Sequence, residues 1–265
     1  MLTFLHISDS HISGDPEYNP PWETAPSPHP NLGVERLLAM INRLPFPIDF
    51  ILHTGDVCAD PRAEDCRKAR ELLLQFPGPM YCLPGNHDSA ELMIDLLHDG
   101  RRLHVLRDDH VEIAGYHLVT LDTNGAGNGD VHAPTISDPQ IEAFAERMKA
   151  TGGGPTIVAG HHPLIETGVP WIDEGMRVQN GERIHRILRR HRDSLAGVFH
   201  GHIHQSMNTH SDGVLYVSCQ STWTNLAGYP GLGENERDDL TPGGFNLVML
   251  KGSRSFVRRY HLARQ

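Results

Sequence analysis

The chain has 265 residues, 23 of them basic and 33 acidic, which gives a formal net charge of −10 at pH 7. This acidic balance argues against a broad surface for a nucleic-acid polymer, which would need clustered cations. No apolar stretch approaches the roughly 20 residues of a membrane-spanning helix, so we expect no membrane partner. The length is ordinary for one large α/β unit, and we expect residues 1–265 to form a single domain.

Five apolar segments in the chain are predicted to be β-strands, and a group of polar residues follows each one. The strands are 2–7, 48–54, 79–84, 155–160 and 196–201. The polar groups, in order, are Asp9 and His11, Asp56, Asn86-His87-Asp88, His161-His162, and His202 with His204. Side chains just past the ends of parallel strands converge in one crevice. We therefore expect these residues to meet at one edge of a sheet.

The segments between these strands alternate with them. Residues 14–33 are rich in proline, which excludes helix and central strand there, and we predict a loop at the mouth of the active site. Helical spacing follows at 34–44, 62–76, 89–99, 138–150 and 181–191, with Asp138 as the N-cap of the fourth helix and Pro139 at its first position. Short β segments are predicted within 102–124, around Ala114-Gly115.

The last quarter of the chain predicts two hairpins, at 205–221 and 244–262. We expect them to dominate a second sheet that follows the mixed one. Two sheets packed face to face and flanked by helices form an α/β fold, a four-layer αββα sandwich.

Three loops are expected to surround the crevice: 14–33, 165–180 and 222–243. They offer aromatic rings that could stack on a base, and stacking is worth about 1–3 kcal/mol. The alternative for each ring is packing against the scaffold. The candidates are Tyr18, Trp22, Trp171, Trp223 and Tyr229.

The four cysteines show no paired spacing, which suits reduced thiols buried in a cytoplasmic protein. The N-terminus has no signal-peptide pattern, because the first polar group already begins at Asp9.

The polar groups supply about twice the ligands of a mononuclear zinc site, which is enough for two metal ions. In Asp9-x-His11, and again in His202-x-His204, the two side chains would share one face of an extended segment. Two ions about 3.5–4 Å apart need a bridging carboxylate, and Asp56 beside Gly55 is the best candidate.

Taken together and in order, these motifs resemble the calcineurin-like metallophosphoesterase superfamily over residues 9–204. The resemblance implies two ions of iron, manganese or zinc and in-line attack on phosphorus by a metal-bridging hydroxide. It assigns His87 to phosphate binding or leaving-group protonation, with Asp88 orienting His87. The implied ligands of the first ion are Asp9, His11, Asp56 and His204, and those of the second are Asp56, Asn86, His161 and His202.

Within the superfamily, the chain is most similar to bacterial class III cyclic-nucleotide phosphodiesterases and their glycerophosphodiesterase relatives. Ala59 stands where purple acid phosphatases have a ligating tyrosine, and Asp88 stands where protein phosphatases have glutamate. Pro84 before the third motif and Pro163 after the fourth fit the bacterial branch. This resemblance implies hydrolysis of small phosphodiesters, with 3′,5′-cyclic nucleotides such as cyclic AMP as the first expectation. Dimers are common in the family, so a homodimer stays open.

Three alternatives remain at this point: a glycerophosphodiesterase, a phosphomonoesterase, and a non-catalytic metal-binding scaffold. Other histidines are not expected to bind metal. We place His6 and His53 in the core or behind the ligands, and His162 either behind the ligands or facing away.

Overall fold

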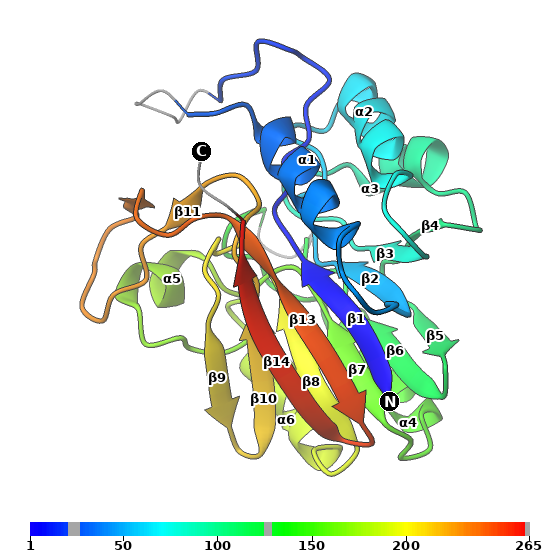
Figure 1. The fold of residues 1–265 in the computed structure, drawn as a ribbon. Helices are drawn as coiled ribbons and strands as arrows, with labels where there is room; N and C mark the ends of the chain where they lie inside the picture. Colours follow the sequence, from blue (N-terminus) through cyan, green and yellow to red (C-terminus); the bar gives the residue numbers. More distant parts are fainter. Residues whose placement is uncertain (21–26, 125–128, 263–265) are drawn as a thin grey trace.

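Two six-stranded mixed sheets form the centre of the molecule (Figure 1). The computed structural model describes residues 1–20, 27–124 and 129–262. The first sheet has the order β14 (Arg254–His261), β13 (Gly244–Lys251), β1 (Leu2–Ile7), β2 (Phe50–His53), β3 (Met80–Cys82) and β4 (Leu103–Val105). The second has the order β5 (His110–Ile113), β6 (Tyr116–Thr120), β7 (Thr156–Ala159), β8 (Leu195–His200), β10 (Val214–Ser218) and β9 (Asn208–Ser211). A separate two-stranded ribbon pairs β11 (Asn225–Leu226) with β12 (Arg237–Asp238).

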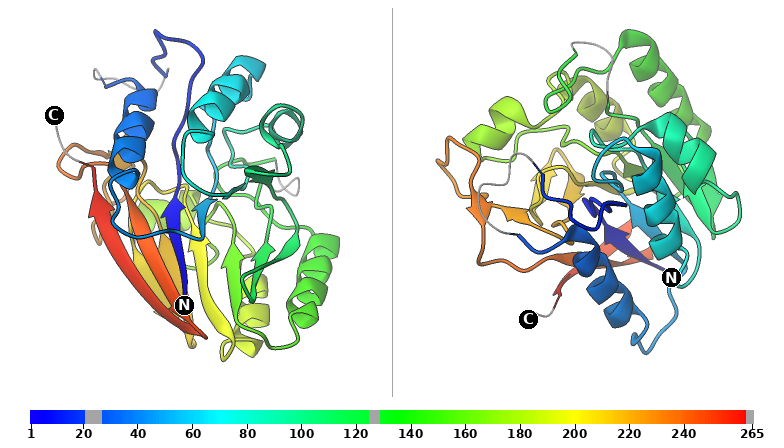
Figure 2. Two further views of the ribbon diagram at one scale, coloured as in Figure 1. Left: turned by 45° about the vertical axis from the view of Figure 1, so that its right-hand side comes forward. Right: turned by 90° about the horizontal axis from the view of Figure 1, so that it is seen from above.

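Helices cover the outer face of each sheet, so the predicted αββα sandwich is confirmed (Figure 2). The first sheet is covered by α1 (Pro30–Ile41), α2 (Ala63–Leu73), and the short α3 (Ala90–Leu92) that runs into a π-helical turn, η1 (Met93–Leu97). The second sheet is covered by α4 (Asp138–Ala150) and α6 (Glu182–Arg190). Helix α5 (Pro170–Gly175) lies instead on the side of the molecule that carries β11.

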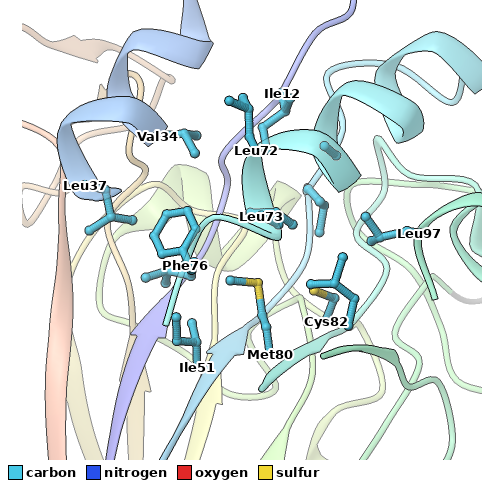
Figure 3. Close-up of a cluster of buried hydrophobic side chains, with 14 of the residues drawn as sticks. Ile12, Val34, Leu37, Ile51, Leu72, Leu73, Phe76, Met80, Cys82 and Leu97 are labelled. Carbon is cyan, nitrogen blue, oxygen red and sulfur yellow. The ribbon is translucent and has the colours of Figure 1, made fainter. Parts of the chain in front are cut away.

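Three buried apolar layers hold the sandwich together. One lies between α1, α2 and the first sheet, where Leu37, Leu73 and Met80 pack together (Figure 3). A second lies between the two sheets, where Phe4 stacks on Phe50 at 4.7 Å and meets the edge of Phe199 at 5.3 Å. The third fills the space under α4 and α6. Apolar side chains on both faces of each sheet explain why the central strands read as continuous apolar runs.

The assignment of strands to sheets differs from the expectation. The five strands followed by polar groups do not share one sheet, because β1, β2 and β3 lie in the first and β7 and β8 in the second. The final hairpin also joins the first sheet, where β13 runs antiparallel to β1 with Leu2 opposite Leu250. A pairing between residues so far apart in the chain leaves no local signal in the sequence.

Several element boundaries also differ from the predictions. Helix α1 begins at Pro30, so the exclusion of helix from 14–33 is wrong for its last residues; proline is well tolerated in the first turn, where its missing N–H costs nothing. The N-cap position of α4 is occupied by Ser137, whose side chain makes no capping hydrogen bond, and Asp138 is the first residue of the helix. The predicted loops 165–180 and 222–243 contain α5 and the β11–β12 ribbon.

No helix in the described residues is long and apolar enough to cross a bilayer. The four cysteines are free and buried, as the sequence predicts.

Candidate metal centre and substrate cavity

The polar groups that follow β1, β2, β3, β7 and β8 meet at one end of both sheets. One cluster brings the ligand atoms of Asp9, His11, Asp56 and His204 within 4.8 Å of one another. A second does the same for His161, His162 and His202. The amide oxygen of Asn86 lies 3.0 Å from Nε2 of His161. The seven residues that the sequence proposed as metal ligands are therefore together, although they come from two sheets.

Asp56 lies between the two clusters. Its Oδ2 is 3.8 Å from Nε2 of His11 and 3.4 Å from Nε2 of His161. Its Oδ1 accepts a hydrogen bond from the backbone N–H of His87 at 2.9 Å. One carboxylate oxygen thus faces a histidine of each cluster, which is the position a bridging ligand needs.

The backbone at five of the candidate ligands is left-handed. The φ angles are 53° at Asp9, 46° at His11, 52° at Asp56, 68° at His202 and 47° at His204. The expectation that Asp9 and His11, or His202 and His204, share a face of an extended segment is therefore wrong. Left-handed φ costs a non-glycine residue about 1–2 kcal/mol, and it persists where the surrounding structure imposes it.

Hydrogen bonds between the loops impose this backbone. The N–H of Asp9 donates to the carbonyl of Gly55, and that of His11 donates to the carbonyl of Asp56, both at 3.0 Å. The N–H of His202 donates to the carboxylate of Asp9 at 3.1 Å. The three loops are thereby fastened to one another across the two sheets.

Glycines allow the loops to pack this closely. A Cβ on Gly85 would lie 2.1 Å from Oδ1 of Asp56, and a Cβ on Gly201 would lie 1.8 Å from Oγ of Ser8. These two glycines therefore mark places where a neighbouring loop lies directly against backbone that has no side chain.

The ring nitrogens of His161 and His204 have defined roles. Nδ1 of His161 lies 2.8 Å from the carbonyl of Thr54, and Nδ1 of His204 lies 2.7 Å from the carbonyl of Thr224. Because a carbonyl can only accept, each Nδ1 carries a proton and Nε2 is the nitrogen that faces the cluster; in the neutral ring of His204 this Nε2 has a lone pair. Nε2 of His204 is 3.1 Å from Nε2 of His11 and 3.6 Å from Oδ1 of Asp9. Lone pairs and carboxylate oxygens therefore converge, an arrangement that bound cations stabilise.

The electrostatics of the site point the same way. Burial disfavours the charged forms of His161 and Asp56, but their mutual attraction outweighs it, so the pKa of His161 rises to about 9 and that of Asp56 falls well below its usual range. Burial raises the pKa of Asp9 to about 7 against the opposing effect of His161. Burial lowers the pKa of His204 to about 4, which keeps this ring neutral, the form that binds metals. The donor set fits two metal ions, and nitrogen and oxygen donors do not discriminate among iron, manganese and zinc.

Asp88 does not have the contacts that the sequence predicted for it. Its carboxylate accepts hydrogen bonds from the backbone N–H groups of Val57 at 3.0 Å, Cys58 at 2.8 Å and Gly85 at 2.8 Å. Nδ1 of His87 lies 3.0 Å from the carbonyl of Ala59, which orients the ring in place of Asp88. Asp88 therefore ties the loop of Asp56 to the loop of Asn86.

The histidines placed behind the ligands are buried and hydrogen-bonded. His6 lies 3.0 Å from Oγ1 of Thr54, and His53 lies 2.9 Å from Oγ of Ser10. His162 uses both ring nitrogens, because Nε2 donates to the carbonyl of Val131 at 3.0 Å and Nδ1 accepts from Thr123 at 2.8 Å. His162 thus supports the cluster without a lone pair to offer.

Sequence reasoning missed His132. Its carbonyl lies 3.2 Å from Nε2 of His202, and its ring stacks over the ring of His202 at 6.2 Å. His132 has no motif around it, so nothing in the sequence singled it out.

A cavity of about 560 Å³ opens over the clusters. Its lining combines His11, Asp56, Asn86, His87, His202 and His204 with side chains from 165–180 and 222–243, among them Met176, Trp223, Leu226 and Asn235. Two of the three predicted loops therefore line the cavity. The described part of 14–33 supports it indirectly, because the carbonyl of Pro28 accepts a hydrogen bond from the indole of Trp223 at 2.7 Å.

Of the candidate aromatic residues, Trp223 lines this cavity. Trp171 is buried and donates its indole N–H to the carbonyl of Ala227 at 3.0 Å, so it packs against the scaffold. Tyr229 is exposed, and Tyr18 lies against Trp223 with ring centroids 6.4 Å apart. Trp22 lies outside the described residues.

Comparison with known proteins matches residues 2–206 to the calcineurin-like phosphoesterase family. The 3′,5′-cyclic adenosine monophosphate phosphodiesterase CpdA of Vibrio vulnificus is 25% identical over 202 residues, which cover 76% of this chain and 70% of CpdA. The glycerophosphodiester phosphodiesterase GpdQ of Enterobacter lignolyticus is 26% identical over 183 residues, which cover 66% of this chain and 62% of GpdQ. A dimetal phosphatase from Danio rerio shares the fold, with a TM-score of 0.63 at 13% identity over 98% of this chain and 99% of that one.

Proposed function

The chain belongs to the calcineurin-like phosphoesterase family and is a metal-dependent phosphodiesterase, and we propose that its substrates are small phosphodiesters, first among them 3′,5′-cyclic nucleotides such as cyclic AMP. The observation that carries this proposal is the position of Asp56, with one carboxylate oxygen facing a histidine of each cluster. The cavity above it, of about 560 Å³, has the size of a small-molecule site.

In this proposal, Asp9, His11, Asp56 and His204 hold one ion, and Asp56, Asn86, His161 and His202 hold the other. Bound metal ions would supply a hydroxide nucleophile near neutral pH and offset the charge of the phosphate. The carbonyls of Thr54 and Thr224 hold two of the imidazoles so that Nε2 faces the ions.

His87 is the residue that we assign to the phosphate. It lines the cavity, and its ring lies 4.9 Å from that of His11. Nδ1 of His87 lies against the carbonyl of Ala59, so we assign Nε2 to a phosphate oxygen or, in the protonated ring, to the leaving oxygen. Asn86 binds metal, and Asp88 positions the Asp56 and Asn86 loops without touching substrate.

Glycerophosphodiesters and phosphomonoesters are the alternative substrates. GpdQ, a relative of similar identity, is a glycerophosphodiester phosphodiesterase. We favour cyclic nucleotides because Met176, Trp223 and Leu226 give the cavity apolar walls, which suit a base better than glycerol. A non-catalytic scaffold is disfavoured, because all seven candidate ligands are present and lie together.

The test is the Asn86→Ala and His161→Ala variants, assayed on a bis-aryl phosphate with manganese supplied. We expect hydrolysis to be lost while the circular dichroism spectrum stays that of the wild type. Near wild-type turnover in either variant would contradict the ligand assignment. Comparing cyclic AMP, a glycerophosphodiester and a phosphomonoester on the wild-type enzyme then ranks the three substrate classes.

A further inference from the structure

We propose that Met176, Leu226 and Asn235, which we call the cap wall, bind the nucleoside part of the substrate and set the preference for nucleotides over glycerol esters. This inference rests on the proposed function, because it concerns the same cavity. The three residues line the cavity together with the candidate metal ligands. They come from the loop after α5 and from the β11–β12 region, which lie on one side of the molecule (Figure 1).

The cap wall is built on an apolar cluster of its own. Val169, Trp171, Ile172 and Ile203 are buried together, with Met176 and Leu226 packed against them. The backbone N–H of Trp171 donates to the carbonyl of Leu232 at 3.3 Å, and its indole donates to Ala227 at 3.0 Å. Trp171 therefore joins α5 to the start and the middle of the loop between β11 and β12, so the apolar part of the wall is formed before substrate binds.

The same cluster fixes the wall relative to the metal centre. Ile203 is fully buried in it and stands in the chain between His202 and His204. From the other side, the carbonyl of Thr224, next to β11, holds Nδ1 of His204 at 2.7 Å. These contacts hold the cap wall at a fixed position relative to the candidate ligands. A site that selects substrates by their size needs its binding groups held in this way.

The chemistry of the wall favours a base. Met176 and Leu226 offer no hydrogen bonds, so the hydroxyl groups of a glycerol moiety would lose water there without compensation. A flat base buries apolar area against the same side chains. The side chain of Asn235 is exposed and has no hydrogen-bond partner among the described residues; its amide can both donate to and accept from the edge of a base.

The experiment measures binding on the full chain loaded with Mn²⁺, by calorimetry, for adenosine 5′-monophosphate and sn-glycerol 3-phosphate. The variants are Asn235→Ala and Met176→Gln. The matched controls are Asn208→Ala on β9 and Met40→Gln on α1, neither of which lines the cavity.

We expect the wild type to bind the nucleotide more tightly than glycerol phosphate. Each wall variant should raise the Kd for the nucleotide about five- to tenfold, the value of one hydrogen bond or a comparable contact, with the Kd for glycerol phosphate unchanged. Equal weakening of both ligands, or no change for either, would overturn the inference. Failure of the proposed function would appear separately, as a manganese-loaded wild type that binds these ligands but hydrolyses no phosphodiester.

Discussion

Left-handed non-glycine residues occur in two regions of the described chain, the metal centre and the hairpin turns. Five of them are candidate ligands, and the other two, Ala114 and Asp212, sit in the turns of β5–β6 and β9–β10. In the turns, each such residue is followed by a glycine that is also left-handed, Gly115 or Gly213. This is the ordinary geometry of a tight hairpin, and it is set by local sequence.

The two regions differ in what surrounds the backbone. A Cβ on Gly115 would meet nothing within 4 Å, whereas a Cβ on Gly201 would collide with Ser8 and Asp9. In the β5–β6 turn the unfavourable φ is therefore a local cost. At the candidate metal centre it is imposed by neighbouring loops, and it orients a candidate ligand. Similar φ angles thus reverse the chain in the hairpin turns and orient candidate ligands at the other site. Substitutions in the two regions should therefore have different effects on activity and stability.

The largest expected effect comes from one substitution made in both regions, Asp56→Asn and Asp212→Asn. Asp56→Asn removes the charge that faces both clusters, so phosphodiester hydrolysis should fall by about a thousandfold or more. Asp212→Asn should leave turnover unchanged. Steady-state assays with manganese measure both, and comparable activity in the two variants would contradict the role of Asp56.

The next effect compares two glycine substitutions, Gly201→Ala and Gly115→Ala. Overpacking at Gly201, where the new Cβ would lie 1.8 Å from Ser8, should reduce the free energy of unfolding by about 3 kcal/mol and abolish activity. At Gly115 only the left-handed backbone is penalised, by about 1 kcal/mol, with activity retained. Urea unfolding and the hydrolysis assay provide the readouts. A Gly201→Ala protein as stable and active as the wild type would show that the loops do not pack as described.

A smaller effect is expected at Ala114, which holds a φ of 49° without the tolerance of asparagine for that region. Ala114→Asn should raise the free energy of unfolding by about 0.5 kcal/mol, because asparagine is less strained there. Turnover should not change. A lower free energy of unfolding in Ala114→Asn would contradict this explanation, because it would show that the left-handed backbone is not what limits stability at this turn.

The smallest effect is a pH dependence at Asp212. Hydrogen bonds from Arg189 and His185 lower the pKa of this carboxyl in the folded state. A depressed pKa means that the stabilisation is present above the unfolded value near 4 and is lost as the pH falls through the folded value. The thermal midpoint of Asp212→Asn should therefore lie slightly below that of the wild type at pH 7, and the gap should close towards pH 3. A difference in thermal midpoint that grew as the pH fell would contradict a lowered pKa of Asp212 in the folded state.

The sequence allowed much of the site to be predicted, because its signals are local. Gly55-Asp56 and Gly201-His202 are short motifs after apolar strands, and through their order along the chain the family resemblance predicted the set of candidate ligands that the structure brings together. The division of the strands between two sheets depends on long-range pairing, such as that of Leu2 with Leu250, and could not be read locally. The contacts of Asp88 could not be predicted either. Its carboxylate accepts hydrogen bonds from the backbone N–H groups of Val57 and Cys58, and such backbone contacts leave no signal in the sequence.

The cavity was predicted in outline only. Loops 165–180 and 222–243 line it, but aromatic character alone did not separate Trp223, which lines the cavity, from Trp171, which belongs to α5 and is buried. Packing decides which face of a ring is available, and His132 shows that an exposed loop residue can join the site without any motif.

Anomalous scattering from crystals grown with Mn²⁺ is the most direct test of a centre organised around Asp56. We predict two manganese peaks about 3.5–4 Å apart, one on each side of the Asp56 carboxylate. One peak should lie among Asp9, His11 and His204, and the other among Asn86, His161 and His202. A single peak, or two peaks that do not share Asp56, would contradict this prediction.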